Sequence, residues 1–200
     1  MSDSATKAKE RSLGAKGEAT RRRLMEAAEE IFGTKGFYHT SIGDITSGAG
    51  VAQGTFYLYF AGKVEIFKAL VHHLSHELRT ATEAAAKAAP NRLEAERLGI
   101  EAFYRFVDQH RNLYRIIRQA EFVDEELYRW YYERLAKGYQ NRLRQAMERG
   151  EIRSVDPELL AWCLMAVSDY TGQRYILWQD GNQADPGALI DILTRGMRKE

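Results

Sequence analysis

Four residues in the first third of the chain have groups suited to contacts with a nucleic acid. Gln53, Gly54, Thr55 and Tyr57 face outward if residues 53–59 form a short helix, and none of them is acidic. Glutamine can hydrogen bond to a base edge, and hydroxyl groups can hydrogen bond to phosphate. Glycine inside a helix costs about 1 kcal/mol relative to alanine. We therefore interpret Gly54 as a place where a second backbone, such as a phosphate strand, comes close.

Further hydroxyl groups and one lysine flank this segment. Ser41, preceded by Thr40, offers a hydroxyl that caps a first short helix. Lys63 begins the helix that follows the segment, where free backbone N–H groups favour a phosphate, although a solvated lysine is the alternative. The predicted phosphate contacts are Thr40, Ser41, Tyr57, Tyr59 and Lys63, and the predicted base contacts are Gln53 and Thr55, with Gly54 between them.

Two short helices joined by a tight turn would position these groups. Ile42, Ile45 and Ala49 lie on one face of a first helix, and Gly50 directly after them allows a sharp turn. The second helix of a helix-turn-helix enters the major groove of DNA. Residues 41–60 therefore predict DNA binding, although an apolar–glycine–apolar spacing also occurs in ordinary helical hairpins.

The motif and its flanks resemble the signature of the tetracycline-repressor (TetR) family of transcriptional regulators over roughly residues 18–78. Thr46 departs from the family, which usually has alanine there, and Gln53 stands where many members carry lysine or arginine. The resemblance implies a homodimeric repressor on a palindromic double-stranded DNA operator. The matching residues are Gly36, Phe37, Thr40, Ser41, Ile45, Ala49, Gly50, Val51, Gly54, Thr55, Tyr57, Tyr59, Phe60 and Lys63.

The periodicity of apolar residues predicts an all-α fold of about nine helices, with a three-helix head and a larger helical body. We expect a basic arm at 1–16, a helix-turn-helix DNA-binding domain at 17–78, and a ligand-binding and dimerisation domain at 79–200. The predicted helices span 18–33, 42–49, 53–59, 63–78 with a possible extension to Pro90, 92–109, 112–122, 125–149, 157–178 and 186–197.

Composition and charge restrict the class of protein. The hydrophobic content of 44% is sufficient for a core, and the net charge of +1 gives no overall indication of nucleic acid. Residues 1–23 hold seven basic and three acidic residues, which either contact phosphates or the minor groove or form a solvated tail. No apolar run approaches the roughly 18 residues of a membrane span. The single Cys163, in an apolar run, fits a reduced cytoplasmic setting and predicts an inert thiol.

Nothing in the sequence predicts catalysis. The chain lacks G-x-S-x-G, G-x-x-x-x-G-K-[ST] and H-E-x-x-H motifs, so we expect no catalytic residues and no cofactor. His72, His73, His76 and Glu77 have a spacing that suits a metal. Histidines on such a linking helix are more often surface or pocket-wall residues, so we expect no metal site.

The body is rich in aromatic residues, which either fill the core or line a small-molecule cavity. Arg115 and Arg118 share a helix face with Arg111, and this face is either solvated or binds the anionic group of a largely apolar ligand. Such a ligand would be a fatty acid or an acyl-coenzyme A. The candidate ligand-binding residues are Phe103, Phe106, Tyr114, Arg115, Arg118, Phe122, Tyr131 and Tyr170.

The last two helices, at 157–178 and 186–197, are the candidate dimer interface. The first is apolar nearly all round, and in the TetR family the corresponding helices form a four-helix bundle across the dimer. Ligand binding would move the helix that starts at Lys63 and change the spacing of the two heads. The alternative is a DNA-bound architectural or protein-interaction module without an effector, which a body lacking a cavity would favour.

Overall fold

The computed structural model describes residues 14–178 and 186–198. Within these ranges the chain forms nine α-helices and one π-helical turn and no strand, which confirms the all-α prediction. The helices are α1 Ala15–Lys35, α2 Ile42–Gly48, α3 Gln53–Phe56, α4 Lys63–Lys87, α5 Arg92–Gln109, α6 Leu113–Val123, α7 Glu125–Glu148, α8 Pro157–Gly172 and α9 Pro186–Met197, with the π-helix η1 at Gln173–Leu177.

Capping side chains explain where several helices of the body begin. The side chain of Asn91 accepts a hydrogen bond from the backbone N–H of Glu94 at the start of α5. Asp124 does the same for Leu127 at the start of α7. Asp156 caps α8, which has a proline in its first turn. These caps satisfy N–H groups that have no partner within the helix.

Several helix boundaries differ from the prediction, and the first helix spans Ala15–Lys35 instead of 18–33. The second helix of the motif ends at Phe56 rather than at residue 59, and residues 57–59 continue as turns. Leu58 and Tyr59 donate to carbonyls three residues earlier, which is the tighter 3₁₀ pattern. The predicted helix 157–178 ends as an α-helix at Gly172 and continues as η1.

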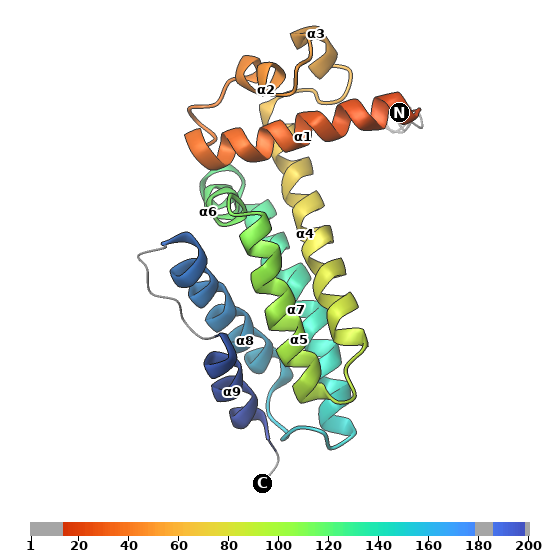
Figure 1. Cartoon of the computed structure of the whole chain (residues 1–200), viewed down its shortest axis with the longest axis vertical. Helices are drawn as coiled ribbons and strands as arrows, with labels where there is room; N and C mark the ends of the chain where they lie inside the picture. The colour runs from red at the N-terminus through yellow and green to blue at the C-terminus, as the bar shows by residue number, and fades with distance from the viewer. Residues whose placement is uncertain (1–13, 179–185, 199–200) are drawn as a thin grey trace, which may run out of the picture.

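The first three helices form a head on one end of an elongated body (Figure 1). Helix α1 lies across that end, with α2 and α3 on its outer side and α6 beneath its C-terminal end. Helix α4 leaves the head and runs along the body beside α5 and α7. Helices α8 and α9 lie along one side of the body, away from α4 (Figure 1). Helix α4 therefore joins the head to the far end of the body.

One hydrophobic core extends from the head into the upper body. Leu24 and Phe32 of α1 and Phe67 of α4 are fully buried in the same cluster as Val107 of α5 and Ile116 of α6. Helix α4 also crosses the predicted domain boundary at 78–79 without interruption. A second cluster at the base of the body joins α7, α8 and α9. The head and the upper body therefore share their interior.

Candidate nucleic-acid interface and ligand cavity

The start of α2 is fixed by a capping box. The Ser41 hydroxyl accepts from the Asp44 backbone N–H at 3.1 Å and donates to the Asp44 carboxylate at 2.6 Å. Gly50 then turns the chain with a φ of 63°, a left-handed conformation that favours glycine. Hydrogen bonds from Lys35 and Ser41 hold the pKa of Asp44 well below its usual range. Ser41 is exposed, but its hydroxyl is engaged by this neighbouring carboxylate.

Helix α3 presents a polar, open face. Gln53 and Gly54 are exposed, and a Cβ added at Gly54 would meet no atom within 4 Å. Tyr57 is 49% exposed, whereas Phe56 and Phe60 are buried beneath it. The buried phenylalanines anchor the segment, so its outward groups are held on a fixed backbone. The space beside Gly54 is therefore open, and the approach of a phosphate strand there stays a prediction.

Thr55 and Tyr59 are less exposed than their neighbours. Both are half-buried, and Tyr59 packs against the hydrophobic core of the head. Each keeps part of its side chain at the surface, so a hydroxyl contact with DNA stays a prediction for both.

Thr40 has a different role from the predicted one. Its side chain is buried, and its hydroxyl donates to the Gly36 carbonyl at 2.7 Å. The hydroxyl therefore holds the loop between α1 and α2 and does not reach the surface. The prediction of a phosphate contact through this side chain was wrong. The sequence shows that a hydroxyl is present, but not that a backbone carbonyl already accepts its hydrogen bond.

Lys63 is half-buried and bound to the same loop. Its ammonium donates to the carbonyls of Phe37 at 2.8 Å and Thr40 at 2.9 Å, and it lies 4.4 Å from the centroid of the Phe37 ring. An ammonium has three N–H donors, so at most one is left for a phosphate. The structure thus gives Lys63 a loop-holding role that the sequence did not indicate.

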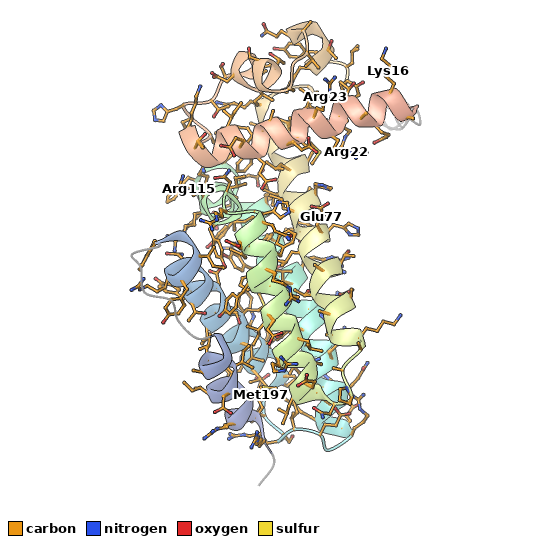
Figure 2. All side chains as sticks on the ribbon, in the orientation of Figure 1. Lys16, Arg22, Arg23, Glu77, Arg115 and Met197 are labelled. Atoms are coloured by element: carbon orange, nitrogen blue, oxygen red, sulfur yellow. The ribbon has the colours of Figure 1, made fainter. Side chains whose placement is uncertain are left out.

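Basic side chains lie along the N-terminal half of α1. Lys16, Arg22 and Arg23 are exposed and project from this helix (Figure 2). Arg21 instead lies over the buried ring of Phe60, 5.4 Å from its centroid. Residues 1–13 of the predicted basic arm lie outside the described residues, and residues 15 and 16 already belong to α1.

Helix α6 holds the C-terminal end of α1 from below. Arg115 donates to the Gly33 carbonyl at 3.0 Å, and Gln119 donates to the Phe32 carbonyl at 3.1 Å. The Gln119 amide oxygen also accepts from the backbone N–H of Phe37 at 2.5 Å. Arg115 lies below α1 in Figure 2. Several hydrogen bonds to backbone groups therefore fix α6 to the head.

The body contains a cavity of about 110 Å³ between α4, α5, α7 and α8. Leu78, Ile100, Leu135 and Leu164 supply apolar walls, and Phe103 and Tyr131 close one end. A water molecule needs roughly 10–15 Å³ on this scale, so the cavity has room for a segment of a small molecule. A second cavity of about 10 Å³ adjoins it and shares four lining residues, Phe103, Tyr131, Tyr132 and Asp169.

Charged groups line the larger cavity at both ends. At one end, Arg92 and Glu96 in the first turns of α5 form a buried ion pair. The Tyr139 hydroxyl donates a hydrogen bond to the Glu96 carboxylate. At the opposite end, burial raises the pKa of Asp169 to about 6, partly opposed by Arg118. Arg92, Glu96 and Asp169 were not among the site residues predicted from the sequence. An acid within the apolar run of α8 was a signal for Asp169.

Four of the eight predicted ligand residues line a cavity. Phe103 and Tyr131 line both cavities, and Tyr114 and Arg118 line the smaller one. The other four line neither cavity, so the structure lends their predicted ligand contacts no support. Phe106 is buried in the core, Arg115 binds the α1 backbone, and Phe122 and Tyr170 are 74% and 66% exposed.

An apolar stripe on α8 faces solvent. The exposed residues follow helical spacing and are Leu159, Trp162, Cys163, Ala166 and Tyr170. The thiol of Cys163 is therefore at the surface, and its inertness stays a prediction. The opposite stripe of α8 packs on the body. Trp178 after η1 and Ile192 of α9 are also exposed, at 58% and 68%. Contiguous apolar surface of this kind marks an interaction site.

Comparison with known proteins identifies the head. The family model of bacterial regulatory proteins of the tetR family matches residues 24–70. The chain belongs to the TetR family. It is 28% identical over 193 residues to the uncharacterized HTH-type transcriptional regulator YdgC of Bacillus subtilis (strain 168), covering 92% of this chain and 96% of that protein.

Solved TetR-type structures share the fold. A TetR family transcription regulator from Marinobacter aquaeolei VT8 has a TM-score of 0.77 at 19% identity, covering 92% of this chain and 98% of that one. The transcriptional regulator FadR from Bacillus subtilis, solved in complex with stearoyl-CoA, has a TM-score of 0.70 at 22% identity, covering 87% and 95%. This TetR-family chain is therefore a DNA-binding transcriptional regulator of the helix-turn-helix type.

Neither a metal site nor a membrane helix is found in residues 14–178 and 186–198. No group of three or more His, Cys, Asp or Glu side chains in this part of the TetR-family chain could hold a metal ion. His72 packs against the Trp130 ring at 4.0 Å between centroids, while His73 pairs with Glu77 at 3.2 Å. No helix among these residues has the length and apolar character needed to cross a bilayer.

Proposed function

We propose that this regulator is a homodimeric repressor that binds a palindromic DNA operator and leaves it when a small amphipathic molecule enters the body. The observation that carries the DNA-binding part is the open face of α3, where Gln53, Gly54 and Tyr57 are exposed above the buried Phe56 and Phe60. A fixed backbone with outward neutral groups suits a recognition helix.

The contacts with DNA divide by chemistry. Gln53 and Thr55 read base edges, with glutamine preferring adenine because it can both donate and accept. The hydroxyls of Tyr57 and Tyr59 hold phosphates, joined by Lys16 and Arg23 on the side of α1 where α3 lies, whereas Arg22 projects from the opposite side (Figure 2). The Ser41 hydroxyl contacts a phosphate only when it releases its hydrogen bond to Asp44. Lys63 has one N–H left for a phosphate beside its two bonds to backbone carbonyls.

A second copy of the chain covers the exposed stripe on α8 and α9. One short recognition helix reads few base pairs, and a two-fold dimer reads two half-sites about one helical turn apart. Burying Leu159, Trp162, Tyr170 and Ile192 against their symmetry equivalents would remove large apolar groups from water. Because the interface is isologous, the two heads lie at related ends of the dimer.

Helix α6 offers a direct route from the cavity to the head. One of its faces carries Tyr114, Ile117 and Arg118, which line the smaller cavity. Another carries Arg115 and Gln119, which bind backbone groups of α1 and Phe37. A ligand that displaces α6 therefore moves the attachment of α1, in addition to any movement of α4. Two rigid heads with altered spacing lose affinity for one operator.

The cavity supports this sensor role over the alternative of a DNA-bound module with no effector. Its apolar walls and charged ends suit an amphipathic molecule. The FadR structure holds stearoyl-CoA, which supports fatty acids and acyl-coenzyme A thioesters as the first compounds to test.

The test begins with selection of bound sequences from a random DNA library by the purified dimer. We expect a palindromic site with half-sites separated by about one helical turn. Fatty acids and acyl-coenzyme A thioesters are then added to the complex, and DNA release is followed by fluorescence anisotropy. Binding to duplexes without sequence preference, or retention of DNA with every compound that binds the protein, would favour the module without an effector.

A further inference from the structure

One end of the larger cavity, called the mouth below, lies between the C-terminal parts of α4 and α7. Small or short side chains meet there, namely Thr82 and Ala86 of α4 and Gly138 of α7, and all three are half-buried. Arg79 and Arg142 flank them, and both approach the Glu83 carboxylate, at 3.7 Å and 3.5 Å. Two arginines sharing one carboxylate leave an excess of positive charge at the mouth. An anionic group is favoured at this end.

The path from this mouth along α7 leads to a second polar end. Between Arg142 and Tyr131 the helix rises about 16 Å, and the walls over this distance are mainly apolar. Asp169 and Tyr132 then separate the larger cavity from the smaller one. The two cavities adjoin at these residues, so the far end of a ligand in the larger cavity lies next to the smaller one.

The Tyr114 hydroxyl lies at the far end without a hydrogen-bond partner. The side chain is 5% exposed and lines the smaller cavity, and its oxygen is fully buried. Gly172 makes room for it, because a Cβ at that position would lie 2.4 Å from the Tyr114 oxygen. Phenylalanine would fill the same space without burying a polar group, and a buried polar group without a hydrogen-bond partner destabilises the folded state. A ligand that forms a hydrogen bond with the Tyr114 hydroxyl would supply the partner that this group lacks.

We propose that the cavity binds a two-ended amphipathic molecule, a long-chain carboxylic acid or its thioester that carries a hydroxyl group at the far end of the chain. Its anionic group lies at the Arg79 and Arg142 mouth, and its hydroxyl reaches Tyr114 past Asp169. This inference rests on the proposed ligand-sensing function and specifies the chemical class of the effector.

The charges at the far end select a neutral group there. A second carboxylate would face the carboxyl of Asp169, and an ammonium would face Arg118, which lines the smaller cavity with it. A hydroxyl can accept from Tyr114 and donate to Asp169, so it satisfies both without adding charge. A terminal methyl group would leave the Tyr114 oxygen unpaired.

The experiment compares matched acids of equal length. Hexadecanoic acid, 16-hydroxyhexadecanoic acid and hexadecanedioic acid, together with the twelve- and fourteen-carbon sets, are titrated into the full-length protein by calorimetry. We expect the hydroxy acid of the best-fitting length to bind about tenfold more tightly than the plain acid, with the diacid weaker than the hydroxy acid. Equal affinities, tighter binding of the plain acid, or no binding of any of these acids would overturn the proposal.

The Tyr114→Phe variant assigns the preference to one atom. It removes only a buried, unpartnered hydroxyl, so we expect a melting temperature at least as high as that of the parent. The preference for the hydroxy acid should fall below about twofold, while binding of the plain acid is unchanged or tighter. Tyr128→Phe is the matched control, because Tyr128 packs on Tyr132 at 5.1 Å between ring centroids but lines neither cavity. A preference that survives Tyr114→Phe would overturn the assignment.

DNA release distinguishes this proposal from the proposed function. Acids that bind with the expected preference but leave the operator complex intact would contradict the sensor function and uphold the ligand class. Acids that release DNA with no difference between hydroxyl and methyl ends would uphold the sensor function and overturn the ligand class.

Discussion

Single residues of the head differ in how directly they can act on DNA. Tyr57 is half-exposed on a backbone fixed by Phe56. Thr40 and Lys63 instead donate hydrogen bonds to backbone carbonyls of the loop before α2. Sequence alone groups these residues, because all carry polar atoms within one motif. Only the fold separates a hydroxyl that faces solvent from one that faces a carbonyl.

Replacing Tyr57 with alanine should weaken operator binding by about 1–3 kcal/mol and leave the dimer intact. The ring is outside the core, so folding does not depend on it. Tyr57→Phe separates the hydroxyl from the ring, and we expect it to keep part of the affinity. Binding is measured by anisotropy with the selected operator. A variant that binds as tightly as the parent would show that α3 is not the recognition helix.

Lys63→Ala should reduce both stability and DNA affinity. Loss of hydrogen bonds to the Phe37 and Thr40 carbonyls should lower the free energy of unfolding by about 1–3 kcal/mol. If the third N–H contacts a phosphate, the slope of log affinity against log salt also decreases by about 1. Denaturant titration and a salt series measure the two effects separately. An unchanged salt slope would restrict Lys63 to its loop-holding role.

Asp169 should make stability depend on pH. Its pKa is raised from 3.8 to about 6 by burial, so the folded state favours the neutral form. The carboxyl group therefore opposes folding progressively as pH rises from about 4 through 6. Asp169→Asn should gain about 2 kcal/mol of stability relative to the parent between pH 4 and pH 7. Denaturant titrations at fixed protein concentration measure this difference, and a constant offset across pH would contradict it.

Among the helices, α6 departs most from the prediction in the contacts that its side chains make. Its limits were predicted to within one residue, and its three arginines were predicted to act together on one helix face. In the fold, Arg115 reaches the α1 backbone, Arg118 lines a cavity, and Arg111 pairs with Asp108 at 2.7 Å. Periodicity predicts which residues share a helix face. It does not predict which neighbouring helix each residue meets.

The contact between α1 and α6 should be sensitive to a single methyl group. A Cβ at Gly33 would lie 2.1 Å from the Asn112 side chain, so Gly33→Ala should destabilise the protein by about 1–3 kcal/mol. Asn112→Gly in the same chain should restore part of this loss, since it removes the overlapping Cβ and Cγ atoms. Thermal unfolding of both variants is the measurement. An additive loss in the double variant would show that the two residues do not meet.

At the scale of the whole molecule, the all-α fold was predicted correctly from the sequence. Strong helical periodicity and capping residues such as Asn91 and Asp156 made the helices readable. The domain boundary at 78–79 stays a prediction, since α4 continues through these residues and one core lies on both sides of the head–body junction. The sequence offered a cavity lined by aromatic residues as one reading, but not its position, because small residues such as Gly138 and Ala86 also line it.

Charge placed on the exposed stripe should separate the dimer. Leu159→Glu combined with Ile192→Glu puts carboxylates where apolar surface would be buried, and we expect a monomer at micromolar concentration by sedimentation. Operator affinity should fall with it, because one head reads too few base pairs. Phe122→Glu is the control, since Phe122 is 74% exposed outside this stripe. A dimer that persists in the double variant would place the interface elsewhere.

The unbroken length of α4 makes it a lever arm. From Leu78, at the cavity, to Lys63, at the head, the helix rises about 22 Å. A tilt of only about 5° at the cavity would carry the head through about 2 Å, and two opposed arms would alter the distance between heads by about 4 Å. That is more than a tenth of the roughly 34 Å that separates successive major-groove sites. A ligand no larger than a lipid chain can thus produce, by leverage, a mismatch on the scale of the DNA repeat.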